Sequence, residues 1–226
     1  MCFKYDLTPF KAELHTKGYV HLKDVLSDAF VAELKEFNEK AMSLAADENK
    51  SAQVEGKKRQ FVFGFSSDET AREFRKGIAC LTSMDEGKIT ISERHLKVYD
   101  AKANPWPSPH KDRCASQISI GLPIALSKGS TVAVFPTLDL SENPNDKAMF
   151  ISESDNINSQ KAYIANEAVL LNETVGDLIL FNGSSIFHER VNAAGTSVLY
   201  IKINDKGDDP LGENIYAPAA TSKVAA

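Results

Sequence analysis

The hydrophobic pattern of the chain changes at Lys88, and this change constrains the fold more than any other feature. Before it, apolar residues recur every three or four positions, as in Phe30, Leu34 and Phe37, which is the period of a helix. After it, short apolar runs are separated by Gly, Pro and Asn, which is typical of a β-sandwich or jelly roll. The chain is therefore predicted to be mainly β with flanking helices, built on a sandwich or jelly-roll core. We expect its strands at 89–99, 115–126, 130–136, 147–152, 168–175, 177–182, 185–191 and 197–204.

The length of 226 residues suits one domain and is enough to bury a substantial core. We expect a single domain over 1–226, with a mostly helical preface at 1–87, the core at 88–204 and a tail at 205–226. The preface is predicted to begin with a helix from Thr8 to Gly18, a strand at 19–22 and a longer helix from Ser27. A polar loop is expected at 48–60, then a buried strand or an aromatic wall near the site at 61–65, and then a helix opened by a Ser66-x-x-Glu69 capping box.

Composition excludes several classes of function. Lys and Arg number 26 against 31 Asp and Glu, a formal net charge of −5, which argues against the basic surface of a nucleic-acid-binding protein. The sequence has no apolar run of about 18 residues, so we expect no membrane partner. Cys2, Cys80 and Cys114 lack the spacing of a zinc motif or a disulfide framework, and free thiols fit a reducing compartment, so we expect a cytoplasmic protein.

His110, Asp112 and His188 are candidate metal ligands. Residues two apart on a strand point the same way, so His110 and Asp112 can both face a barrel interior. Two histidines and one carboxylate can occupy one face of a metal octahedron and leave the other face open, as in non-haem Fe(II) oxygenases. Short motifs also match by chance, and a turn histidine and a core histidine remain open alternatives. A partner for the second nitrogen of His188 is expected at Asn182, Ser184 or Ser185.

His110-Lys111-Asp112, the Gly176-Asp177-Leu178-Ile179-Leu180-Phe181 segment and His188 together resemble the Fe(II)- and 2-oxoglutarate-dependent oxygenases. The phytanoyl-CoA-dioxygenase-like branch is the closer match, over about residues 95–204. The resemblance implies a double-stranded β-helix (jelly-roll) core. It also implies that His110, Asp112 and His188 bind Fe(II) and that 2-oxoglutarate and O₂ are converted to succinate and CO₂ while a substrate is oxidised. Because Asp112 is present, the resemblance implies hydroxylation or a related oxidation rather than halogenation. The small chain favours a small-molecule substrate, such as an amino acid or a secondary-metabolite intermediate; the oligomeric state is not predicted.

The same family neutralises the distal carboxylate of 2-oxoglutarate with a cation on the last core strand, about ten residues after the distal histidine. Here that position is Val198, which departs from the pattern. We expect Lys202 to take this role, with Tyr99 as a supporting donor and Lys97 as the next choice. Arg190 is expected to form a surface ion pair instead.

The predicted strand at 94–100 has two unlike faces. Leu96 and Val98 share one face, and Lys97 and Tyr99 share the other. The polar face either lines a site or belongs to an edge strand that meets water, and the sequence leaves both interpretations open.

Two other functions fit the sequence. An iron-dependent, cupin-type dioxygenase or isomerase would not need 2-oxoglutarate, and the absence of a cation at Val198 favours it. A non-catalytic jelly-roll binding module would use His110 and His188 only as structural residues. Metal content separates this module from the two enzymes, and succinate formation separates the enzymes from each other.

Overall fold

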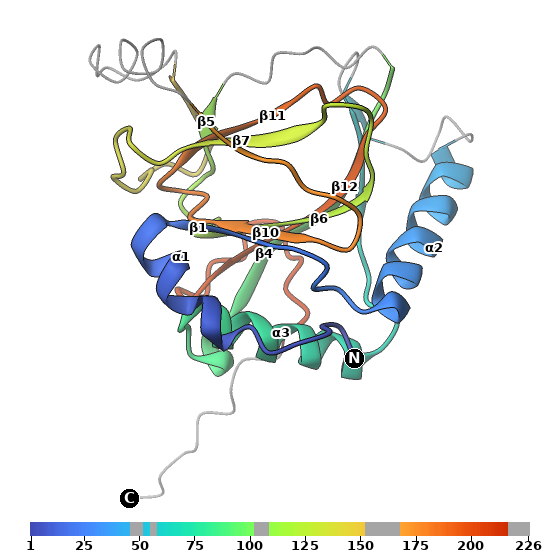
Figure 1. The fold of residues 1–226 in the computed structure, drawn as a ribbon, viewed down its shortest axis with the longest axis horizontal. Helices are drawn as coiled ribbons and strands as arrows, with labels where there is room; N and C mark the ends of the chain where they lie inside the picture. Colours follow the sequence, from blue (N-terminus) through green and yellow to red (C-terminus); the bar gives the residue numbers. More distant parts are fainter. Residues whose placement is uncertain (46–51, 55–57, 102–108, 152–167, 217–226) are drawn as a thin grey trace, which may run out of the picture.

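The computed structural model describes residues 1–45, 52–54, 58–101, 109–151 and 168–216. Two antiparallel β-sheets face each other as a double-stranded β-helix, and helices pack on the outside of the larger sheet (Figure 1). The predicted fold class, mainly β with flanking helices around a jelly-roll core, is confirmed.

The larger sheet has seven strands, in the order β1 (Tyr19–Leu22), β10 (Leu178–Phe181), β6 (Ile118–Ala125), β12 (Ser197–Asn204), β4 (Thr90–Tyr99), β3 (Lys58–Val62) and β2 (Ala52–Val54). The smaller sheet has five, in the order β8 (Met149–Phe150), β5 (His110–Lys111), β11 (Phe187–Val191), β7 (Thr131–Phe135) and β9 (Val169–Leu171). Each predicted core strand contains an observed one. The strand β5, which is only two residues long, was missing from these ranges, although the ligand prediction placed His110 and Asp112 on a strand.

The helical elements are η1 (Thr8–Phe10), α1 (Lys11–Lys17), α2 (Asp28–Ala45), α3 (Asp68–Thr82) and η2 (Glu86–Lys88). As predicted, α1 ends at Gly18, which has the left-handed conformation with φ 74°. The cap of α3 lies one residue later than predicted, because Ser67 accepts the Thr70 backbone N–H while the Ser66 hydroxyl donates to Glu33. None of the helices in the described part of the chain is long and apolar enough to cross a membrane.

Two predictions about the preface were wrong in their boundaries. The region 48–60, expected as a polar loop, contributes β2 and most of β3, which pair with each other in antiparallel register. The strand expected at 61–65 instead covers 58–62 and pairs with β4. Because β4 therefore lies between β3 and β12, the interpretation of β4 as an edge strand is also wrong.

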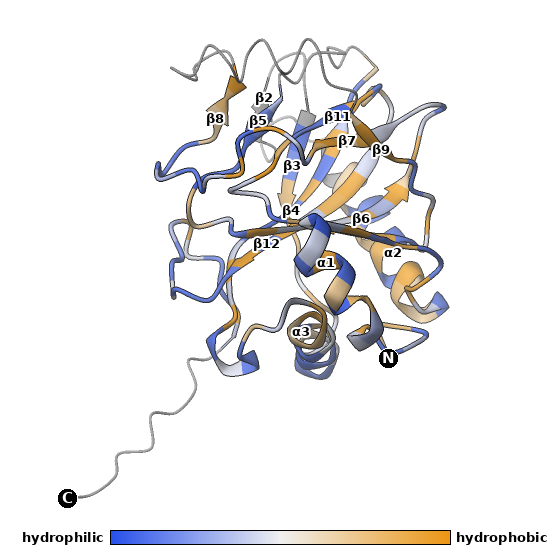
Figure 2. Ribbon diagram, turned by 60° about the vertical axis from the view of Figure 1, so that its left-hand side comes forward, coloured by the Kyte–Doolittle hydropathy of each residue, from blue (hydrophilic) through white to orange (hydrophobic). Residues whose placement is uncertain are grey.

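The largest apolar cluster lies between the outer face of the larger sheet and the helices. Leu96 of β4 and Ile201 of β12 belong to it, together with Phe74 and Ile78 of α3. The apolar side of α3 faces the sheet and its hydrophilic side faces away (Figure 2). Since side chains alternate along a strand, the neighbouring residues of the same strands point into the space between the two sheets. That inner face carries the polar side chains described next.

Candidate metal centre

The two predicted histidine ligands lie opposite each other on neighbouring strands of the smaller sheet. His110 of β5 is the direct antiparallel partner of His188 of β11, and their ring centroids are 4.6 Å apart. Asp112 is the residue directly after β5. One donor atom from each of His110, Asp112 and His188 lies within 4.8 Å of the others, so the structure brings together all three residues singled out in the sequence.

The Asp112 backbone is fixed by two hydrogen bonds. Its N–H donates to the Gly183 carbonyl at 2.8 Å, and its own carbonyl accepts from the Asn143 amide at 2.8 Å. A Cβ atom at Gly183 would lie 2.7 Å from Asp112 Oδ2 and would collide with the Ser119 hydroxyl. Only glycine leaves room for this close approach.

The Asp112 carboxylate has one protein donor on each oxygen. The Lys202 ammonium donates to Oδ1 at 2.7 Å, and the Ser119 hydroxyl donates to Oδ2 at 2.5 Å. Burial alone would raise the pKa of Asp112, but Lys202 and the two imidazoles hold it well below its usual value. The carboxylate is therefore ionised, as a metal ligand must be.

His188 is buried, and its Nδ1 lies 2.9 Å from the Ile186 carbonyl. This contact assigns the ring proton to Nδ1 and turns Nε2 towards Asp112 Oδ2, 3.7 Å away. Burial lowers the pKa of His188, which favours the neutral imidazole that binds metals. The expected side-chain partner among Asn182, Ser184 and Ser185 was wrong, since a backbone carbonyl takes that role.

The donor set fits a divalent transition metal. Two imidazole nitrogens and one carboxylate oxygen suit Fe(II) and leave coordination positions open, whereas Mg²⁺ and Ca²⁺ prefer oxygen ligands alone. His110 is the more accessible histidine, with 23% of its side chain exposed, and its ring contacts Phe150 of β8. His188 packs against Phe181 on the opposite sheet, with ring centroids 4.5 Å apart.

A network of buried charges adjoins the three residues. Glu93 on the inner face of β4 lies 2.9 Å from the Lys97 ammonium, 3.4 Å from Lys202 and 3.3 Å from Arg113. Burial would raise the pKa of Glu93, but Lys202 and Lys97 hold it well below its usual value. Glu93 was not among the predicted site residues, although it has the same strand parity as Lys97 and could have been found that way.

Arg190 is buried rather than at the surface, so the expected surface ion pair was wrong. It points inward because it lies two residues after His188 on β11. Its guanidinium donates to the buried Glu173 carboxylate, to the Tyr200 hydroxyl at 2.8 Å and to the Ser130 hydroxyl at 3.1 Å. Burial raises the pKa of Tyr200 to about 12, so its hydroxyl keeps its proton.

The other two predicted co-substrate residues, Lys97 and Tyr99, share the inner face of β4 with Glu93. The Lys97 ammonium lies 5.2 Å from the centroid of the Tyr200 ring. Burial raises the pKa of Tyr99, although the nearby Arg190 lowers it in part. The polar face of β4 therefore lines the space between the sheets.

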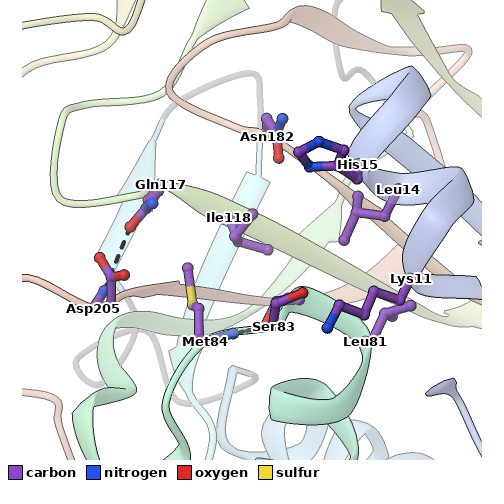
Figure 3. Close-up of a pocket in the computed structure, with 11 residues that line it drawn as sticks. Lys11, Leu14, His15, Leu81, Ser83, Met84, Gln117, Ile118, Asn182 and Asp205 are labelled. Carbon is purple, nitrogen blue, oxygen red and sulfur yellow. Dashed lines mark hydrogen bonds between the residues drawn. The ribbon is translucent and has the colours of Figure 1, made fainter.

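A surface pocket lies on the opposite face of β6 from the three candidate ligands. It is lined by residues of α1, the end of α3, the start of β6 and the segments around Asn182 and Asp205 (Figure 3). Ile118 lines this pocket and belongs to the apolar cluster under the helices, whereas the next residue, Ser119, contacts Asp112. The pocket is therefore separated from the candidate metal centre by the larger sheet.

No protein-family model matches the sequence, and no curated protein matches it significantly. Solved structures do resemble it. The non-haem alpha-ketoglutarate-dependent epimerase SnoN from nogalamycin biosynthesis is 15% identical and has a TM-score of 0.60, over 87% of this chain and 82% of its own. EvdO2 from Micromonospora carbonacea var. aurantiaca, solved with 2-oxoglutarate, is 14% identical with a TM-score of 0.56, over 90% and 91% of the two chains. A prolyl-4-hydroxylase from Pseudomonas putida is 13% identical with a TM-score of 0.50, over 88% and 98%.

The chain has the fold of 2-oxoglutarate-dependent oxygenases. At these identities the likeness concerns the fold alone, and the chemistry has to be argued from the side chains described above.

Proposed function

We propose that the protein is a non-haem Fe(II)- and 2-oxoglutarate-dependent oxygenase that hydroxylates or otherwise oxidises a small metabolite. The observation that carries this proposal is the convergence of His110, Asp112 and His188 within 4.8 Å inside the jelly roll. We further propose that it belongs to the phytanoyl-CoA-dioxygenase-like branch and acts in the cytoplasm, where its three free thiols would stay reduced.

The chain's own contribution is to hold the ligands, exclude water and orient the substrate. When bound, iron with 2-oxoglutarate would supply the activation of O₂. The ionised Asp112 would supply the one negative charge to a divalent metal, and His110 and His188 would supply imidazole nitrogens. An apolar cluster that includes Val134 and Phe181 lies beside His188. These side chains would exclude water from the site and so limit side reactions.

The distal carboxylate of 2-oxoglutarate needs a buried cation, because an unpaired charge in such a cavity is costly. We propose Arg190 for this role. It lies two residues beyond His188 on the same face of β11, a separation of roughly 6–7 Å along a strand. That separation suits a five-carbon diacid whose other end chelates the metal. The Arg190 guanidinium, with the Tyr200 and Ser130 hydroxyls beside it, offers several hydrogen-bond donors to a carboxylate.

Lys202, with Tyr99 in support, and Lys97 are the competing candidates. Lys202 donates to Asp112 at 2.7 Å, which favours a position beside the metal rather than at the far end of the co-substrate. Lys97 is paired with Glu93 at 2.9 Å. Arg190 is itself paired with Glu173, so binding of 2-oxoglutarate requires the guanidinium to share its donors between two carboxylates.

The pairing with Glu173 makes a sharp test possible. Glu173→Gln should tighten 2-oxoglutarate binding, because it removes a competing carboxylate from Arg190. The double variant Arg190→Met/Glu173→Gln leaves no buried charge unpaired and should weaken binding by roughly a hundredfold or more. Titration of 2-oxoglutarate into anaerobic Fe(II) protein, followed by the metal-to-ligand charge-transfer band, measures both effects. Iron affinity should change little in either variant.

Each other outcome identifies a different site or function. Loss of 2-oxoglutarate binding in Lys202→Met but not in the double variant would make Lys202 the anchor, and the same pattern in Lys97→Met would select Lys97. An iron-loaded wild type that develops no charge-transfer band and forms no succinate would favour the iron enzyme that does not use 2-oxoglutarate. A wild type that binds no iron would favour the binding module.

A further inference from the structure

The side chain of Lys202 has an unusual position for a lysine beside a metal site. It is 10% exposed, and its ammonium lies 2.7 Å from Oδ1 of Asp112, a carboxylate whose own side chain is 3% exposed. The same ammonium lies 3.4 Å from Glu93. The Lys202 ammonium thus contacts the one ligand that carries a negative charge.

This contact links the two sheets. Lys202 and Ser119 are direct partners in the pairing of β12 with β6, so both are fixed in the larger sheet. Asp112 follows β5 and lies with the two histidines of the smaller sheet. The larger sheet therefore supplies both donors to the Asp112 carboxylate, while the smaller sheet supplies the histidine ligands.

We propose that Lys202 is a positioning residue that holds the Asp112 carboxylate in the site before a metal arrives and then competes with the metal for it. This inference rests on the proposed metal site. It concerns how tightly that site binds its metal.

The competition follows from charge. A divalent ion bound to Asp112 stands within a few ångströms of the Lys202 ammonium, and two cations at such a distance repel each other strongly in a buried site. Before the metal binds, the ammonium balances the Asp112 charge. After it binds, Glu93 remains close enough to pair with Lys202, so the displaced cation keeps a partner.

Orientation and charge are separable here, because Asp112 has a second, neutral donor. The Ser119 hydroxyl still holds Oδ2 at 2.5 Å when Lys202 is replaced. Removal of the lysine charge should therefore strengthen metal binding even though one hydrogen bond is lost.

The test compares Co(II) binding by calorimetry in the wild type, Lys202→Gln, Lys202→Met and Lys202→Arg. We expect Co(II) to bind the Gln and Met variants at least about tenfold more tightly than the wild type. Lys202→Arg keeps the charge and should keep an affinity close to that of the wild type. The metal-free Gln and Met proteins should melt at a lower temperature, and Co(II) should raise their melting temperature more than it raises that of the wild type.

Lys111→Met is the matched control, because Lys111 is also a buried lysine and adjoins Asp112 in the sequence, but its ammonium pairs with Asp139 at 3.2 Å and donates to the Ser141 carbonyl at 2.7 Å. It should lower the melting temperature and leave the Co(II) dissociation constant within about twofold. Equal or weaker Co(II) binding by both Lys202→Gln and Lys202→Met, with folded proteins by circular dichroism, would overturn the inference and leave the metal site intact. A wild type that binds no Co(II) would overturn the proposed metal site and this inference with it.

Discussion

Ser119 is the residue whose role is easiest to isolate. Its hydroxyl donates to Asp112 Oδ2 at 2.5 Å and is held there by β6. Hydrogen-bond partners of this kind typically change metal affinity by about 10–100-fold when removed. Ser119→Ala should therefore weaken Co(II) or Fe(II) binding by roughly that factor, because the carboxylate then keeps the Lys202 contact, which competes with the metal, and loses the neutral donor that does not.

Ser130→Ala is the control for this prediction. Ser130 is also buried between the sheets, but its hydroxyl accepts a hydrogen bond from Arg190, which is not one of the three candidate metal ligands. Its metal dissociation constant should match that of the wild type. A Ser119→Ala protein with wild-type metal affinity would show that Asp112 does not depend on this contact.

At the scale of residues, the sequence was sufficient where chemical type and spacing coincide. His110, Asp112 and His188 could be chosen because they are the residue types that bind iron and because strand parity allowed them to converge. The partners of these residues could not be chosen in the same way. Serine is common, so Ser119 carries no distinctive signal, and the Ile186 carbonyl that contacts His188 belongs to a group present in every residue.

The alternation of β11 determines two opposite environments within five residues. His188 and Arg190 point between the sheets, while Glu189 points to the outer face of the smaller sheet. Glu189 is half-buried, and burial raises the pKa of its carboxyl to about 7. In the unfolded chain a glutamate titrates near about 4.3, so the folded state holds its proton more tightly.

The sign of the resulting pH dependence is fixed by that difference. The contribution of Glu189 to stability is fully present below its unfolded pKa and is lost as the pH rises through about 7. Glu189→Gln, which cannot ionise, should melt at a higher temperature than the wild type at pH 8 and at a similar temperature at pH 4. Thermal unfolding across this range checks it. Glu39→Gln, at an exposed position of α2, should show no such difference; an identical pH profile for wild type and Glu189→Gln would contradict the prediction.

At the level of helices and strands, the spacing of apolar residues and the turn residues predicted the core strands, but not the length of β5 or the N-cap residue of α3. The strand β5 has only two residues, so no alternation can reveal it. The helix α3 begins at Ser67 rather than Ser66, and both serines are acceptable caps, so the choice depends on Glu33 from another helix. Arg190 was misjudged although it has the same strand parity as His188, which places it between the sheets.

In the molecule as a whole, the largest apolar cluster and the candidate site lie on opposite faces of the larger sheet. Phe74 of α3 is 1% exposed, and its ring lies 5.4 Å from Phe65 and 6.0 Å from Phe30. Phe74→Ala should lower the free energy of unfolding by about 3–5 kcal/mol, the usual cost of such a cavity. Well below its melting temperature, the variant should bind metal as tightly as the wild type.

Chemical denaturation and metal calorimetry on the same protein check both parts of this prediction. Val62→Ala, at a position 50% exposed, should change the free energy of unfolding by less than about 0.5 kcal/mol. Loss of metal affinity in folded Phe74→Ala would mean that the helical layer and the site are coupled through the sheet.

Anaerobic equilibrium dialysis of Fe(II) shows whether His110, Asp112 and His188 form one iron site. The wild type should bind one Fe(II) per chain. His188→Ala should bind none measurably, while its circular dichroism spectrum stays that of the folded protein, because the substitution removes a ligand and leaves both sheets intact. Full iron occupancy in folded His188→Ala, or an iron-free wild type, would show that these three residues do not form an iron site.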